Sequence, residues 1–143
     1  MRALLDVNVL IALFDPDHVH HARAWQWFKA WSMQHGWTSC PITQNGVVRV
    51  MSQPGYPNPL QVASVLERLG RATAADSHEF WPDEVSVLDV QRFEHAHIHG
   101  HRQLTDLYLL GLAVARGGGL ASFDRAIPLS AVRGAQPRHL LAI

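Results

Sequence analysis

Five short apolar segments, separated by longer segments of helical character, constrain the fold of this chain more than any other feature. The first segment does not alternate between apolar and polar residues, which is typical of a strand buried on both faces of a parallel sheet. Short strands that alternate with helices favour an α/β architecture with a mainly parallel sheet and right-handed crossovers. The expected strands are residues 3–6, 37–40, 79–81, 120–123 and, at an edge, 138–143.

Helices are expected between these strands, with capping residues or prolines at their starts. The expected helices cover residues 9–14 and 19–31, a segment from 43–45 onward, a segment from the Asn58–Pro59 pair through Leu69, and residues 87–97 and 106–116. Their expected caps include Asn8, Asp17 and Thr105. In the second helix, Ala22, Trp25 and Phe28 share one face, so Trp27 is expected to be exposed unless a partner covers it.

Length and composition indicate one globular unit. The 143 residues, 48% of them hydrophobic and 17% charged, suffice for a single domain over residues 1–143. No apolar run reaches the roughly 18 residues of a membrane span, and the N-terminus lacks a signal-peptide pattern. The single cysteine, Cys40, agrees with a reducing compartment. We therefore expect a cytoplasmic protein with no membrane contact.

The charges exclude global steering toward nucleic acid, because twelve basic and twelve acidic residues give a formal net charge of zero. Eleven of the basic residues are arginine, whose planar fork suits phosphate or carboxylate groups. Arg49, Arg102 and Arg125 lie within a few residues of candidate site residues. They are candidates for phosphate contacts, and surface ion pairs are the alternative for each.

Three carboxylates and one amide occur where strands end or helices begin. Asp6 ends the first expected strand, Asp124 follows the fourth, and Asp106 and Gln44 stand near helix starts. In a parallel sheet all four meet at the carboxyl ends of the strands. Carboxylates packed closely raise one another's pKa unless a cation neutralises them, and oxygen ligands suit Mg²⁺ or Mn²⁺. The alternative is that each aspartate only caps a helix or ends a strand.

The segments that carry these residues resemble a known family. LLDVNVLIALF, TQNGVVRVMS, FWPD, GHRQLTDLYLLGLA and ASFDR resemble, in this order from Leu4 to Arg125, the PIN domain, in particular VapC-type toxin ribonucleases. The resemblance implies a three-layer α/β/α sandwich, an Mg²⁺- or Mn²⁺-dependent endoribonuclease, a cognate antitoxin partner and a homodimer. It also implies that Asp6, Asp106 and Asp124 are the catalytic, metal-holding acids.

Other positions support or depart from the family pattern. Asn8 matches a small polar residue that orients a neighbouring carboxylate, and Thr105 is expected to support Asp106. Gln44 stands where many family members have glutamate, so it ligates weakly and cannot act as a general base. We therefore expect a one-metal scheme rather than a two-metal one.

Two further clusters remain open. His95, His97, His99 and His101 stand at alternate positions, with a solvated helix end preferred over a zinc or nickel site. The tryptophan-rich helix at 19–31 is either a base-stacking platform or, as the resemblance implies, part of a groove for an antitoxin segment.

The leading hypothesis from the sequence is a metal-dependent endoribonuclease toxin with RNA as its substrate. The alternative is a non-catalytic PIN-fold module that binds RNA or protein, with Gln44 as the first sign of lost catalysis. A receiver- or phosphatase-like domain is disfavoured, because the only lysine, Lys29, lies in an early helix and not after a late strand.

Overall fold

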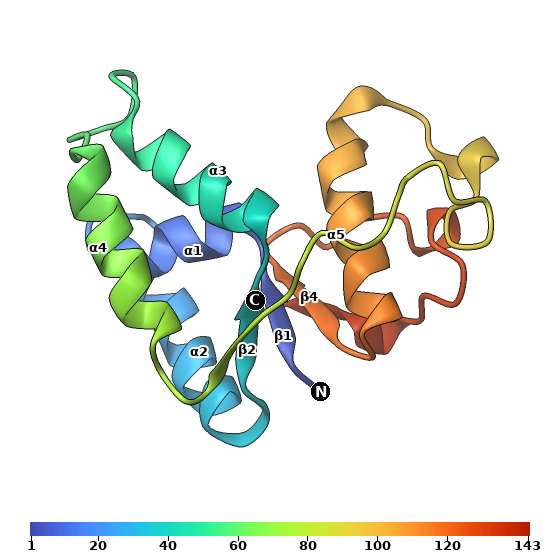
Figure 1. Ribbon diagram of the computed structural model, residues 1–143, viewed down its shortest axis with the longest axis horizontal. Helices are drawn as coiled ribbons and strands as arrows, with labels where there is room; N and C mark the ends of the chain where they lie inside the picture. The colour runs from blue at the N-terminus through green and yellow to red at the C-terminus, as the bar shows by residue number, and fades with distance from the viewer.

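A five-stranded parallel sheet forms the centre of the fold, and the computed structural model describes residues 1–143 (Figure 1). The strand order is β3-β2-β1-β4-β5, and every neighbouring pair is parallel. The strands are β1 Ala3–Leu5, β2 Trp37–Ser39, β3 His78–Phe80, β4 Gly119–Ser122 and β5 Leu140–Ala142. The predicted parallel sheet is confirmed, including the edge position of the last strand.

Helices cover both faces of the sheet, which gives the expected three layers (Figure 1). Side chains of β1 alternate between two cores: Ala3 and Leu5 belong to one core, and Leu4 belongs to the other. The first core contains residues of α1 Val7–Phe14, α2 His21–His35, α3 Pro41–Ser52 and α4 Val62–Thr73. The second core contains most of α5 Leu104–Ala115.

The strand order of the sheet reverses at β1 and β4, which lie side by side. The chain moves outward from β1 to β2 to β3 through α1 to α4 on one face, and then returns through α5 on the other face to place β4 beside β1. Ligands of open parallel sheets bind beyond the carboxyl ends of the strands at such a switch point. Asp6 follows β1 directly, and Asp124 lies two residues after the end of β4.

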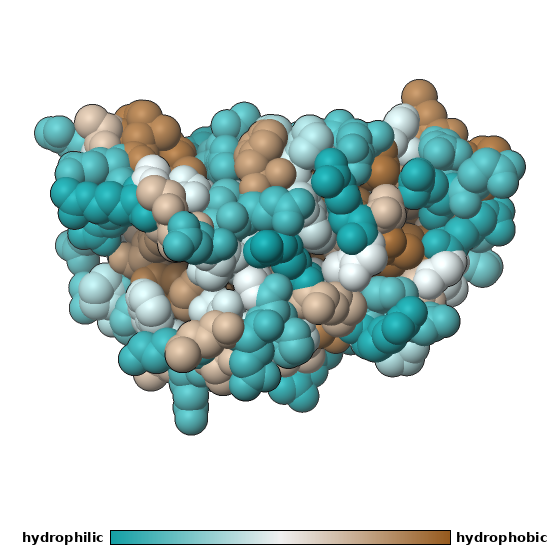
Figure 2. All heavy atoms as spheres, turned by 60° about the horizontal axis from the view of Figure 1, so that its bottom comes forward, coloured by the Kyte–Doolittle hydropathy of each residue, from teal (hydrophilic) through white to brown (hydrophobic).

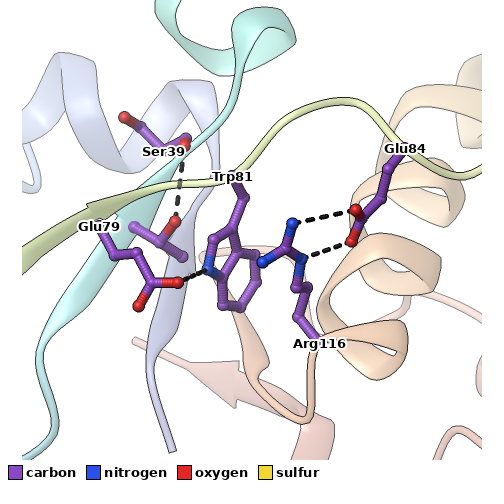
Figure 3. A network of polar contacts seen from close by, with 6 residues as sticks. Ser39, Glu79, Trp81, Glu84 and Arg116 are labelled. Carbon is purple, nitrogen blue, oxygen red and sulfur yellow. Dashed lines mark hydrogen bonds and ion pairs between the residues drawn. The ribbon is translucent and has the colours of Figure 1, made fainter.

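Trp81 anchors the return of the chain after β3 (Figure 3). Its side chain is 2% exposed, its indole N–H donates to Glu79 at 3.1 Å, and its backbone N–H donates to the Ser39 carbonyl at 3.0 Å. Arg116, at the end of α5, lies over the Trp81 ring and forms a two-bond pair with Glu84. These contacts join the β3 edge of the sheet to the carboxyl end of α5.

The predicted starts of all five α-helices differ from those in the structure. The carboxylate of Asp6 accepts the N–H of Val7, so α1 begins at Val7 and Asn8 is not its cap. Helix α2 begins at His21 without a side-chain cap, while the N–H of Asp17 donates to the carboxylate of Asp15.

Helix α3 begins at Pro41, before the expected start at 43–45, with Cys40 as its N-cap residue. The fourth error concerns α4. This helix begins at Val62 after the N-cap residue Gln61, not at the Asn58–Pro59 pair. Asn58 instead adopts a left-handed backbone conformation, with φ of 54°, which suits a turn. Thr105, similarly, is the second residue of α5 and not its cap.

The predicted helix at residues 87–97 is also wrong. This segment forms turns and one 3₁₀ turn, His95–His97, because it pairs with residues 131–133 far along the chain. The ring of Phe93 is fully buried against α5, where a Cβ at Gly111 would stand 2.4 Å from its Cζ. Long-range packing of Phe93 therefore outweighs local helix preference.

The side chains of α2 do not follow the predicted faces. Ala24 is the only buried residue of this helix, whereas Ala22 is exposed. Trp27 is partly buried, packs against the first core and stacks on Trp31 with ring centroids 5.5 Å apart. The prediction that Trp27 is exposed is therefore wrong, because its stacking partner and the core cover it.

The outer surface is mainly polar on the face shown in Figure 2, where hydrophobic atoms gather in separate areas. None of the helices has both the length and the apolar character that crossing a membrane requires.

Candidate active site

Asp6 provides the most buried carboxylate at the carboxyl ends of the strands. Its side chain is 7% exposed, and its Oδ1 accepts the Val7 N–H at 2.7 Å. Its Oδ2 accepts the hydroxyl of Ser122 at 3.2 Å. Burial raises the pKa of Asp6 above the usual range, and the charge of Asp124 raises it further. A buried carboxyl of this kind favours a nearby cation.

Asp106 lies in the first turn of α5 and is half-buried. Burial, together with the charges of Asp6 and Asp124, raises its pKa to about 6. The three aspartates, which come from distant parts of the sequence, are therefore close enough to interact electrostatically. Asp106 and Asp124 also line the same pocket.

Asp124 follows β4 on an exposed turn. Its Oδ1 accepts the N–H of Ala126 at 2.7 Å, and its own N–H donates to the hydroxyl of Ser122 at 3.1 Å. These two hydrogen bonds fix the backbone that carries the third carboxylate.

Ser122 is a site residue that the sequence reasoning missed. Its hydroxyl is buried at the end of β4, donates to Asp6 and accepts from the backbone of Asp124, so it links two of the three acids. A polar residue inside an apolar buried strand, two positions before Asp124, was the signal that could have identified it.

A pocket of about 200 Å³ opens beside two of the acids. Its lining includes Arg102 and Gln103 together with Asp106 and Asp124. Arg102 is therefore placed beside the carboxylates, while Arg125 is exposed next to Asp124 and Arg49 is exposed on α3. None of the three arginines forms an ion pair with a carboxylate, so the surface ion-pair alternative is not found.

None of the three residues expected to support the acids, Asn8, Gln44 and Thr105, forms a side-chain hydrogen bond with them. Gln44 lies in the second turn of α3 and donates its amide N–H to the hydroxyl of Ser39 at 3.0 Å. Ser39 in turn lies 2.8 Å from Nε2 of His78. Asn8 is exposed, and the hydrogen bonds of Asp6 go to Val7 and Ser122 instead.

The donor chemistry of the site fits a hard divalent cation, because Asp6, Asp106 and Asp124 offer only carboxylate oxygens. As they stand, no three His, Cys, Asp or Glu side chains are grouped closely enough to hold a metal ion. The same applies to the histidines at 95–101, of which His95 contacts the Val87 carbonyl and His97 the Ser130 carbonyl.

The fold, with acids at the switch point of a parallel sheet, is that of a PIN domain. The PIN domain family model matches residues 3–133, and the chain belongs to this family.

Among its relatives, Ribonuclease VapC44 of Mycobacterium tuberculosis (strain ATCC 25618 / H37Rv) is 52% identical over 143 residues, which span all of both chains. Ribonuclease VapC39 of the same strain is 41% identical over 138 residues, 94% of this chain and 96% of that one.

A solved structure shares the fold at low sequence identity. It is the crystal structure of VapBC2 from Rickettsia felis bound to a DNA fragment from their promoter. Its TM-score is 0.60 at 10% identity, covering 88% of this chain and 90% of the other.

Proposed function

We propose that this protein is an endoribonuclease and the toxin of a type II toxin–antitoxin system, with Mg²⁺ or Mn²⁺ as its cofactor. The observation that carries the proposal is the grouping of three aspartates at the switch point of the sheet: Ser122 links Asp6 to the backbone of Asp124, and Asp106 and Asp124 line one pocket. The full-length similarity to proteins named as VapC ribonucleases supports the same function.

Asp6, Asp106 and Asp124 would hold the metal ion, directly or through water. When bound, the ion supplies a water of lowered pKa and neutralises charge on the phosphodiester. The buried Ser122 hydroxyl orients Asp6 and the backbone of Asp124. We assign Arg102, which lines the pocket, to contact with an RNA phosphate, and Arg49 and Arg125 to outer phosphate contacts.

We assign Gln44 a supporting role in a one-metal scheme. Its amide N–H donates to Ser39, so its carbonyl oxygen remains available for a metal-bound water. We assign Asn8 and Thr105 the same supporting role, through a metal-bound water rather than by a direct bond to the acids. The absence of a glutamate at position 44 leaves the site with one negative charge fewer than the family pattern has.

We further propose an antitoxin as the protein partner, a homodimer as the assembly and the cytoplasm as the location. The Rickettsia felis VapBC2 structure, which has the same fold, supports the antitoxin by analogy.

The test is cleavage of total cellular RNA with Mg²⁺, with Mn²⁺ and with EDTA. Asp106→Asn removes a charge and a ligand with almost no change of shape, and Asp76→Asn is a matched control on an exposed turn. We expect metal-dependent cuts by the wild type and by Asp76→Asn, and none by Asp106→Asn. Equal cleavage in EDTA or by Asp106→Asn would contradict the proposal.

A non-catalytic RNA- or protein-binding module is the second candidate. It is favoured by Gln44 and by the lack of a preformed group of three ligands. Calorimetric titration with Mn²⁺ separates the two functions: intact RNA without metal binding supports the module, whereas metal binding lost in Asp106→Asn supports the nuclease.

A further inference from the structure

We propose that the segment between α1 and α2 forms, with Phe123, a second RNA-contacting site on the opposite side of the acids from Arg102. We call His18, His20, Arg23 and Phe123 the aromatic lip. This inference rests on the proposed ribonuclease function, and it identifies a region of the surface that contacts the RNA.

The lip is built around the ring of Phe123. The His20 ring centroid lies 4.7 Å from the Phe123 centroid, and the His18 ring is nearly parallel to it, at 14° and 6.4 Å. The guanidinium carbon of Arg23 lies 5.2 Å from the centroid of the same ring. Three groups from the start of α2 and its preceding loop thus converge on one residue after β4.

The lip adjoins the catalytic acids. Phe123 stands between Ser122, which bonds Asp6, and Asp124. Helix α2 covers one face of the sheet and α5, with Arg102 before it, covers the other. The lip and Arg102 therefore flank the acids on two sides, as two contacts along one strand of RNA would.

Most polar groups of the aromatic lip have no hydrogen-bond partner within the protein. Arg23 is exposed and forms neither an ion pair nor a side-chain hydrogen bond, so its N–H groups are free for a phosphate. The ring nitrogens of His20 likewise have no protein partner. Nδ1 of His18 accepts the His20 backbone N–H at 3.0 Å, so the neutral ring carries its proton on Nε2, which has no hydrogen-bond partner within the protein.

Aromatic rings together with an unpaired arginine are the chemistry that recognises single-stranded RNA. Bases stack on rings with little sequence preference, and arginine holds the adjacent phosphate. A purely structural role for Arg23 would not require an exposed cation. We assign the lip to one nucleotide beside the scissile phosphate.

The test measures binding without cleavage. A fluorescein-labelled pool of short, random-sequence, single-stranded RNA is titrated with Asp106→Asn protein and followed by fluorescence anisotropy. Arg23→Ala and His20→Ala are added to this background. The matched control is Lys29→Ala, because Lys29 is a cation on the same helix and lies 5.8 Å from the Trp25 ring.

We expect Arg23→Ala to weaken RNA binding about tenfold and to reduce the salt dependence by about one phosphate contact. Lys29→Ala should change affinity less than about twofold. In the active background, Arg23→Ala should raise KM and leave kcat unchanged, which a folding defect would not do selectively.

Equal losses of RNA affinity in Arg23→Ala and Lys29→Ala would overturn the proposed role of the aromatic lip. So would unchanged RNA binding by Arg23→Ala combined with weaker binding of an acidic antitoxin segment. If the wild type cleaves RNA, either result refutes the lip alone. If the wild type does not cleave RNA, the proposed function has failed first.

Discussion

Replacing Ser122 by alanine removes one hydroxyl that links two of the three acids. Ser122 is 1% exposed, donates to Asp6 at 3.2 Å and accepts the Asp124 N–H at 3.1 Å. A hydrogen bond to a charged group contributes about 1.5–3 kcal/mol, and one between neutral groups about 1 kcal/mol. The bond to Asp6 is long and water can reach Asp124, so we expect the free energy of unfolding to fall by about 2 kcal/mol near pH 7.

This loss should depend on pH, because the missing bond stabilises the charged form of Asp6. Burial raises the pKa of Asp6, so the stability that its neutral form contributes is present below the unfolded-state pKa of about 3.9 and is lost as the pH rises through the folded-state pKa. Ser122→Ala raises this pKa further. The variant should therefore lose more stability near pH 7 than near pH 4.

The assay is urea unfolding in EDTA at both pH values, followed by tryptophan fluorescence. Ser130→Ala is the control, since Ser130 is exposed and its hydroxyl makes no hydrogen bond. We also expect metal-dependent cleavage by Ser122→Ala to fall about tenfold, as for other residues that orient metal ligands. A variant with wild-type stability, or with the same deficit at both pH values, would refute the reasoning.

Two further changes test the site and the packing. Gln44→Glu adds a carboxylate at the same end of the sheet and should tighten Mn²⁺ binding about tenfold by calorimetry; an unchanged or weaker affinity contradicts the placement of this residue. Gly111→Ala should cost about 1–3 kcal/mol of stability in urea unfolding, because its Cβ would stand 2.4 Å from Cζ of the buried Phe93. Gly70→Ala in α4, where a Cβ meets nothing, should instead be neutral or stabilising by up to about 1 kcal/mol, and equal effects of the two glycine changes would contradict this account.

Elements specified by local patterns were predicted well from the sequence. The strands β1, β2 and β4 are buried throughout, the edge strands β3 and β5 are partly exposed, and all five lie within a residue or two of the expected positions. Apolar runs that are buried on both faces require a parallel sheet covered by helices, so the architecture followed from them. The positions of Asp6, Asp106 and Asp124 at one end of the sheet followed from the same pattern.

Elements that depend on distant contacts were not predicted. Residues 87–97 have helical spacing, yet they pair with residues 131–133 and bury Phe93 against α5. The starts of α1 to α5 were misplaced because several neighbouring residues can begin a helix, and local preference does not select among them.

The sequence by itself therefore determined the class of fold and the chemical identity of the acids, since both depend on residue type and local periodicity. The tertiary structure alone decided which polar groups meet. Ser122 reaches Asp6 across 116 positions of the chain, and His20 and Arg23 reach Phe123 across about as many. No local pattern encodes such a meeting, because it follows from the register of β1 with β4 and from the packing of α2 over the sheet.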